Sequence, residues 1–184
     1  RELAHYLSDR HSPVIYREHA GVHPIAGGHF FPSEILPDLM AWLESTRREE
    51  TPKEILMVRD RDHPGQNYWL RLDEPAPEVV SWQALPEEME AAEDPPKSEP
   101  VFARLSAVIK GNEITVRAEH VLRYSLLLQR DLLNLDQPVR VTTNGAVSFE
   151  GTVTQDSRQM LREAHRRSDP RMITQAVLEI PVPR

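Results

Sequence analysis

The chain has 184 residues and a formal net charge of −7, long enough for one full domain plus part of another. This acidic balance argues against a nucleic-acid partner, because an extended nucleic-acid surface needs clustered Lys and Arg opposite the phosphates. The chain has no cysteine, which excludes disulfides and thiolate zinc sites. No apolar run approaches the roughly 20 residues that span a bilayer, so we expect no membrane span.

The first fifty residues are expected to alternate helix, strand, loop and helix. Apolar spacing predicts a helix over 1–9, a short strand over 14–19 and a helix over 33–47, with a loop rich in Gly and His over 20–31. This order is typical of a layered sheet with parallel strands. Because the chain opens at Arg1 rather than Met, and inside an expected helix, we expect it to be the C-terminal part of a longer polypeptide, and the absence of a visible signal peptide is uninformative.

The helix over 33–47 is the best marked of these elements. Ser33 can cap its N-terminus, Pro37 suits the first turn, and Arg47 brings positive charge to the carbonyl end. One apolar stripe follows the helical period and comprises Leu36, Leu39, Met40 and Leu43. Residues 49–52 read as a linker, which places the expected domain boundary between residues 1–51 and 52–184.

Strand signals dominate after the linker. Residues 53–59 and 66–73 are expected to pair as a hairpin, and 78–85 is expected to form a third strand. Residues 86–100 are acidic, rich in proline and poor in apolar side chains, which is typical of a solvated loop.

Two further hairpins carry stronger signals. Alternating apolar residues flank Gly111-Asn112, and others flank Asn144-Gly145, the strongest short hairpin signal. Residues 120–128 and 172–182 are expected to be strands.

A helix is expected over 156–167. Asp156 and Gln159 resemble a capping box there, and the expected apolar face comprises Met160, Leu161 and Ala164. The whole chain is therefore predicted to be α+β, with residues 52–184 a mostly antiparallel β-sandwich-like domain carrying one late helix.

The order of strand, Gly27-Gly28-His29 and closing helix resembles the C-terminal end of the α/β-hydrolases, in particular the esterase and prolyl-oligopeptidase-like members. The stretch from Asp136 to Gly145, followed by Phe149-Glu150-Gly151, is similar to a small β module appended to some bacterial members of that family. The resemblance implies a serine hydrolase acting on ester or peptide bonds, without a cofactor. A bacterial protein of this kind can be cytoplasmic or exported.

A serine hydrolase needs a serine, a histidine that removes its proton and a carboxylate that orients the histidine. No G-x-S-x-G occurs in the chain, so the resemblance implies that the nucleophile and the acid lie upstream and that this chain alone is inactive. His29 is the first candidate for the base, because Gly27-Gly28 lets the backbone turn sharply beside it. His23 is the alternative, and a third interpretation makes both ordinary loop histidines.

Other site hypotheses are weaker. His11, His19, His23 and His29 lie close in sequence, but their irregular spacing does not match a zinc motif, and we expect no metal site. Tyr68, Trp69 and Trp82 could line a sugar-binding face, although aromatic residues on strands more often pack in a core. The alternative function for the chain is a non-catalytic β-sandwich binding or structural module on a degenerate hydrolase.

Overall fold

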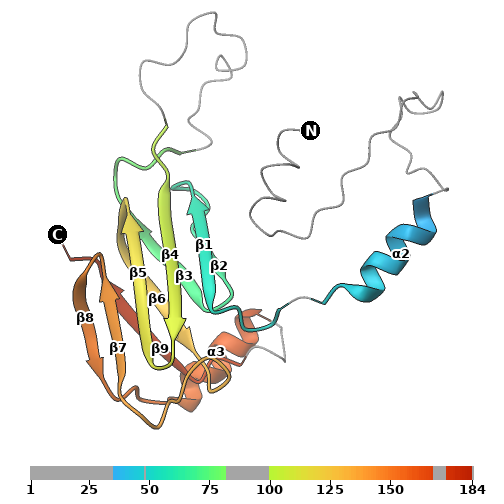
Figure 1. The fold of residues 1–184 in the computed structure, drawn as a ribbon. Helices are drawn as coiled ribbons and strands as arrows, with labels where there is room; N and C mark the ends of the chain where they lie inside the picture. Colours follow the sequence, from blue (N-terminus) through green and yellow to red (C-terminus); the bar gives the residue numbers. More distant parts are fainter. Residues whose placement is uncertain (1–34, 48, 82–99, 168–172, 184) are drawn as a thin grey trace, which may run out of the picture. The chain divides into compact units, whose positions relative to one another are not determined.

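The computed structural model describes residues 35–47, 49–81, 100–167 and 173–183. The chain divides into two compact units, residues 1–48 and residues 49–184. Together the described residues form a mixed α+β structure with mostly antiparallel strands and two helices (Figure 1). Neither of these helices is both long enough and apolar enough to cross a membrane.

In the first unit, helix α2 spans Leu36–Ser45, a few residues shorter than predicted. Pro37 lies in its first turn, and the Arg47 guanidinium donates to the Glu44 carbonyl at 2.9 Å beyond its last turn. The predicted apolar stripe is not buried, because Leu36, Met40 and Leu43 are each about half exposed. The expected helix over 1–9, strand over 14–19 and cap at Ser33 lie outside the described residues.

The second unit contains two sheets. The five-stranded sheet has the order β1-β4-β5-β7-β8, and the four-stranded sheet has the order β2-β3-β6-β9. Every neighbouring pair is antiparallel except β5 and β7, which are parallel. The strands are β1 (Glu54–Arg59), β2 (Gln66–Asn67), β3 (Leu70–Pro75), β4 (Ala103–Lys110), β5 (Glu113–Glu119), β6 (Val121–Leu128), β7 (Val139–Thr143), β8 (Ala146–Gly151) and β9 (Ala176–Pro181). Helix α3 (Ser157–Arg167) lies between β8 and β9 in the chain.

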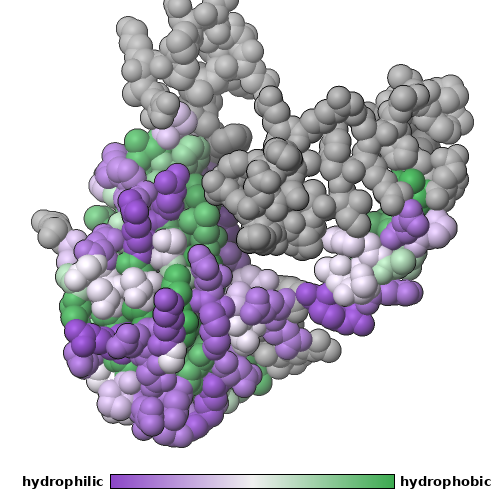
Figure 2. Space-filling model, viewed as in Figure 1, coloured by the Kyte–Doolittle hydropathy of each residue, from purple (hydrophilic) through white to green (hydrophobic). Residues whose placement is uncertain are grey.

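Both sheets contribute to one hydrophobic core. Side chains alternate buried and exposed along β4 and β5, so each of these strands has one face in the core. The Tyr124 hydroxyl of β6 shares a buried 2.6 Å hydrogen bond with the Thr143 hydroxyl of β7, which joins the two sheets inside the core. Trp69 is also buried, and its indole N–H donates to the Pro52 carbonyl at 2.6 Å, so a sugar-binding role for this ring is wrong. On the visible face of the unit, hydrophilic side chains alternate with patches of apolar ones (Figure 2).

The hairpins at Gly111-Asn112 and Asn144-Gly145 are confirmed, as are strands β6 and β9 and helix α3. Gly111, Asn144 and Gly145 all have φ between 51° and 86°, the left-handed region that these turns require.

The predicted hairpin between 53–59 and 66–73 is wrong. β1 pairs with β4 in one sheet, whereas β3 pairs with β6 in the other. The segment read as one strand over 66–73 is itself a tight hairpin, because Tyr68 at φ 50° reverses the chain between β2 and β3. The backbone of β3 therefore pairs with β2 and β6 and not with β1.

Two further predictions need correction. Residues 78–81 are not a strand, because a turn in which the Val79 N–H donates to the Ala76 carbonyl carries Val79 into the core; residues 82–85 lie outside the described part. On α3, Leu161 is 71% exposed, so it does not belong to the packed face. The less exposed side chains of that helix are instead Gln159, Met160, Glu163 and Ala164. The expected solvated loop over 86–100 lies outside the described residues except for Pro100.

Candidate functional site

The sequence-predicted catalytic histidines, His29 and His23, lie outside the described residues. Within the described part, two histidines bond to carboxylates: His63 Nδ1 lies 2.8 Å from Asp60 Oδ2, and His120 Nδ1 lies 2.9 Å from Glu78 Oε1. No histidine of these ranges bonds to a serine hydroxyl, so the part of the chain that the structure describes holds no Ser-His pair. It also holds no group of three or more potential metal ligands, and the four clustered histidines lie outside it.

A row of polar side chains crosses the outer face of the four-stranded sheet. Gln66 of β2 pairs with Arg71 of β3, Arg71 pairs with Ser125 of β6, and Ser125 pairs with Glu179 of β9. Directly paired residues of antiparallel strands project to the same face, so these four side chains form one continuous polar row. Their strand neighbours Leu70, Leu72, Tyr124, Leu126 and Ile180 point into the core.

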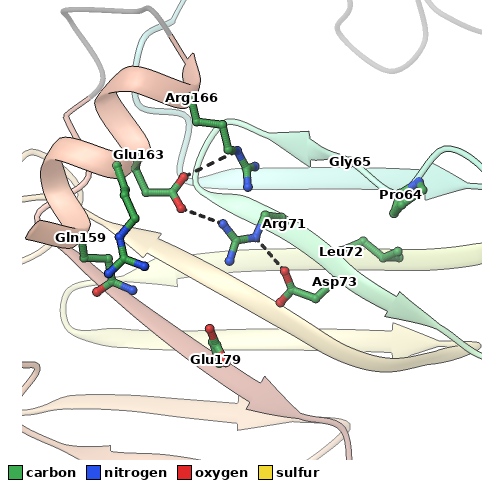
Figure 3. Close-up of a pocket in the computed structure, with 10 residues that line it drawn as sticks. Pro64, Gly65, Arg71, Leu72, Asp73, Gln159, Glu163, Arg166 and Glu179 are labelled. Carbon is green, nitrogen blue, oxygen red and sulfur yellow. Dashed lines mark hydrogen bonds and ion pairs between the residues drawn. The ribbon is translucent and has the colours of Figure 1, made fainter.

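Arg71 is the centre of this polar row. Its Nε donates to Asp73 Oδ1 at 2.7 Å, and Nη1 donates to Glu163 Oε1 at 3.0 Å (Figure 3). Its Nη2 donates to Ser125 Oγ at 3.0 Å. Ser125 in turn donates to Asp73 Oδ2 at 2.5 Å. Burial alone would lower the pKa of Arg71, but the hydrogen bond to Asp73 and the charges of Asp73 and Glu163 outweigh it and raise that pKa. The guanidinium is therefore a permanently charged link between sheet and helix.

Asp73 lies two residues after Arg71 on β3, so strand alternation directs both side chains to the same face, and the backbone is irregular at Asp73. The register between β3 and β6 shifts between Leu72 and Glu74, which leaves Asp73 as the extra residue of a bulge. Bulges re-aim side chains and often lie beside functional sites. Here the Asp73 carboxylate bonds to both Arg71 and Ser125. No periodicity in the sequence signals such a shift.

Helix α3 lies over the polar row and encloses a cavity with it. The cavity has a volume of about 590 Å³ and opens to solvent. Its lining residues are Pro64, Gly65, Arg71, Leu72, Asp73, Gln159, Arg162, Glu163, Arg166 and Glu179. Three arginines and three acidic residues therefore surround one space, with formal charges that cancel.

Several charged groups of this cavity are incompletely paired. Glu163 Oε2 is buried and accepts no hydrogen bond, and its nearest cation is Arg166 Nε at 3.8 Å. Arg166 uses Nη2 to reach Gln66 Oε1 at 3.0 Å. Among the described residues, neither Arg162 nor Glu179 has a hydrogen-bond or ion-pair partner for its side chain.

Sequence reasoning missed this cavity. The sequence patterns described above assign no role to Arg71, Glu163 or Arg166. A usable signal existed in the amphipathic pattern of α3, because Gln159 and Glu163 are polar at positions that share a face with Met160 and Ala164. A polar residue on the packed face of a helix requires a polar partner below it.

Comparisons with models of known protein families, with curated proteins and with solved structures found no match for this chain.

Proposed function

We propose that the chain is the C-terminal section of a serine hydrolase that cleaves ester or peptide bonds. Residues 1–51 are the strand-helix end of its α/β-hydrolase sheet, and residues 52–184 are an appended β-sandwich-like module. His29 acts as the general base toward a serine that lies upstream, with His23 as the alternative base. The upstream serine and acid complete the triad.

Helix α2 is the observation that carries this proposal. It begins seven residues after His29, where the hydrolase pattern requires the closing helix. Its stripe of Leu36, Met40 and Leu43 is about half exposed, which suits a helix whose apolar face packs on a sheet of the same hydrolase domain. The Gly27-Gly28-His29 turn supplies the base in the loop before it.

The β module has no part in the proposed chemistry. Ser125 is fully buried, and its hydroxyl bonds to Asp73 and Arg71 rather than to a histidine that could remove its proton. This arrangement favours the alternative role for residues 52–184, which is binding or structural support beside the hydrolase domain.

The test measures hydrolysis by the polypeptide that contains this chain together with the proposed upstream serine. A p-nitrophenyl ester series and a chromogenic peptide serve as substrates. Changing His29 to Ala should lower kcat by a factor of about 10³ or more, because triad members act as a unit. The matched change His63→Ala, in the β module, should leave kcat unchanged. Equal activity of the wild type and the His29→Ala variant, with loss on His23→Ala, would transfer the role to His23. Activity that survives both changes would overturn the proposal.

A further inference from the structure

We propose that the cavity between α3 and the polar row binds a zwitterionic ligand that carries one carboxylate and one ammonium group, such as a short peptide with free termini. This inference concerns the β module, goes beyond the proposed hydrolase function, and does not depend on His29.

The first argument is the distribution of unpaired charge around the cavity. Arg162 contributes a guanidinium and Glu179 a carboxylate that have no partner among the described side chains. These groups come from opposite walls, since Arg162 is on α3 and Glu179 is on β9. A ligand with a single charge would leave one of them unmatched, whereas a zwitterion pairs with both.

The second argument is the buried oxygen Glu163 Oε2. It belongs to a carboxylate whose side chain is only 12% exposed and whose other oxygen is held by Arg71, so it cannot turn away to solvent. A buried carboxylate oxygen without a donor costs free energy. A ligand ammonium group held by Glu179 in the same cavity would bring a positive charge toward this carboxylate.

The third argument is that the remaining groups are already fixed. Arg71 bonds to Asp73 and Glu163 (Figure 3). Ser125 accepts from Arg71 Nη2 and donates to Asp73, so all three nitrogens of Arg71 are used within the protein. These residues therefore form a rigid floor. Arg162 and Glu179 are left as the groups that contact the ligand, and the volume of about 590 Å³ has room for more than one residue of a peptide.

The experiment is an NMR titration of the ¹⁵N-labelled 184-residue chain with glycylglycine. Two blocked probes accompany it: N-acetyl-glycylglycine lacks the ammonium group, and glycylglycinamide lacks the carboxylate. We expect saturable shifts of the amides of residues 159–166, 71, 73 and 179 with glycylglycine. Each blocked probe should bind about tenfold more weakly, because each lacks one charge-assisted contact.

Two variants assign the contacts, and two matched variants control for charge. Arg162→Gln should remove the preference for glycylglycine over glycylglycinamide, and Glu179→Gln should reduce the preference over the acetylated probe. Arg158→Gln, on α3 but not in the cavity lining, and Glu150→Gln on β8 change the same charges and should leave binding as in the wild type. All four positions are exposed, so folding is expected to survive each change.

Several results would overturn the proposal. Absence of saturable shifts with glycylglycine is one, and binding of either blocked probe as tightly as glycylglycine is another. Equal effects of Arg162→Gln and Arg158→Gln would show a general charge effect instead of a site. Hydrolase activity plays no part in these readouts, so failure here is distinguishable from failure of the hydrolase proposal.

Discussion

Arg71 of β3 donates to Glu163 of α3 at 3.0 Å, and the two side chains are only 13% and 12% exposed. The two residues are 92 positions apart in the sequence. Their bond, with that of Arg166 to Gln66, fastens the only helix of the second unit's described residues onto the outer face of its four-stranded sheet.

Replacing Glu163 with Gln should therefore destabilise the second unit. The change keeps the shape but removes the charge opposite a buried guanidinium, which Asp73 then compensates alone. We expect a loss of about 1–3 kcal/mol in the free energy of unfolding, measured by urea titration. Glu150→Gln on β8 is the matched control, because Glu150 is exposed, and it should change stability by no more than about 0.5 kcal/mol. Equal stability of the two variants would mean that the Arg71–Glu163 pair does not hold the helix.

The Tyr124–Thr143 hydrogen bond predicts a second effect. Tyr124→Phe leaves the Thr143 hydroxyl buried without this partner, and we expect a loss of about 1–2 kcal/mol in the free energy of unfolding. Adding Thr143→Val should cost less than the sum of the two single changes, because the pair is lost only once. A strictly additive double-mutant cycle would contradict a coupled bond between the sheets.

The burial of Tyr124 also predicts that its phenol ionises at unusually high pH. Burial raises the pKa of Tyr124 to about 12, even though the bond to Thr143 opposes the rise. A folded-state pKa above the unfolded value of about 10 means that this stabilisation is complete below pH 10 and is lost as pH rises toward 12. Absorbance at 295 nm should show one of the four tyrosines ionising last, and Tyr124→Phe should remove that step. A last step that persists in the variant would assign it to another tyrosine.

The Asp60–His63 pair predicts a pH dependence near neutrality. The hydrogen bond to Asp60 raises the pKa of His63, and the same bond lowers the pKa of Asp60. The contribution of His63 to the free energy of unfolding is therefore complete below its unfolded pKa of about 6.5. It is lost as pH rises through the raised pKa of the folded state. The contribution of Asp60 is present above about pH 3.9 and is lost as pH falls through the lowered value. The difference in Tm between wild type and Asp60→Asn should be largest between the lowered pKa of Asp60 and the raised pKa of His63. A difference in Tm that does not change with pH would contradict the pairing.

The turn at Asn144-Gly145 predicts that a change at Asn144 lowers the free energy of unfolding by more than most surface changes do. Asn144 has φ 51°, its Nδ2 donates to the Ala118 carbonyl and its Oδ1 accepts from the Ala118 N–H, both at 2.9 Å. Asn144→Ala removes both bonds and places a residue with low left-handed propensity there. We expect a loss of about 2 kcal/mol or more in the free energy of unfolding. Asn144→Gly removes the same two bonds, but glycine adopts positive φ without strain. It should therefore lower the free energy of unfolding by less than Asn144→Ala does. A stability equal to that of the wild type in both variants would show that the side-chain bonds contribute nothing.

The sequence predicted the parts of this fold that depend on local chemistry. Asn144-Gly145 marks a hairpin because both residues accept positive φ, and Asp156 marks a helix start because its side chain accepts from the Arg158 N–H at 2.8 Å. The sequence did not predict which distant segments pair with each other. β1 has the same alternation whether it pairs with 66–73 or with β4, so periodicity could not choose its partner.

The charged cavity was missed for a related reason. Its residues come from three separate segments, residues 64–73, 159–166 and 179. Arg71 and Glu163 look like ordinary solvated charges in the sequence, and only the topology of β3, β6 and β9 places them under one helix. Alternation along β3 places Asp73 on the same face as Arg71, but the bulge that leaves Asp73 without a partner residue on β6 has no sequence signal.

The most direct test of the hydrolase proposal is active-site labelling of the polypeptide that contains this chain and the proposed upstream serine. Wild type, His29→Ala, His23→Ala and the control His63→Ala are treated with a fluorescent fluorophosphonate, which reacts with an activated serine. The proposal predicts that wild type and His63→Ala label equally fast and that one of the other two variants, His29→Ala in the first place, loses labelling. A wild type that does not label would contradict it and would leave the β module, with its charged cavity, as the functional part of the chain.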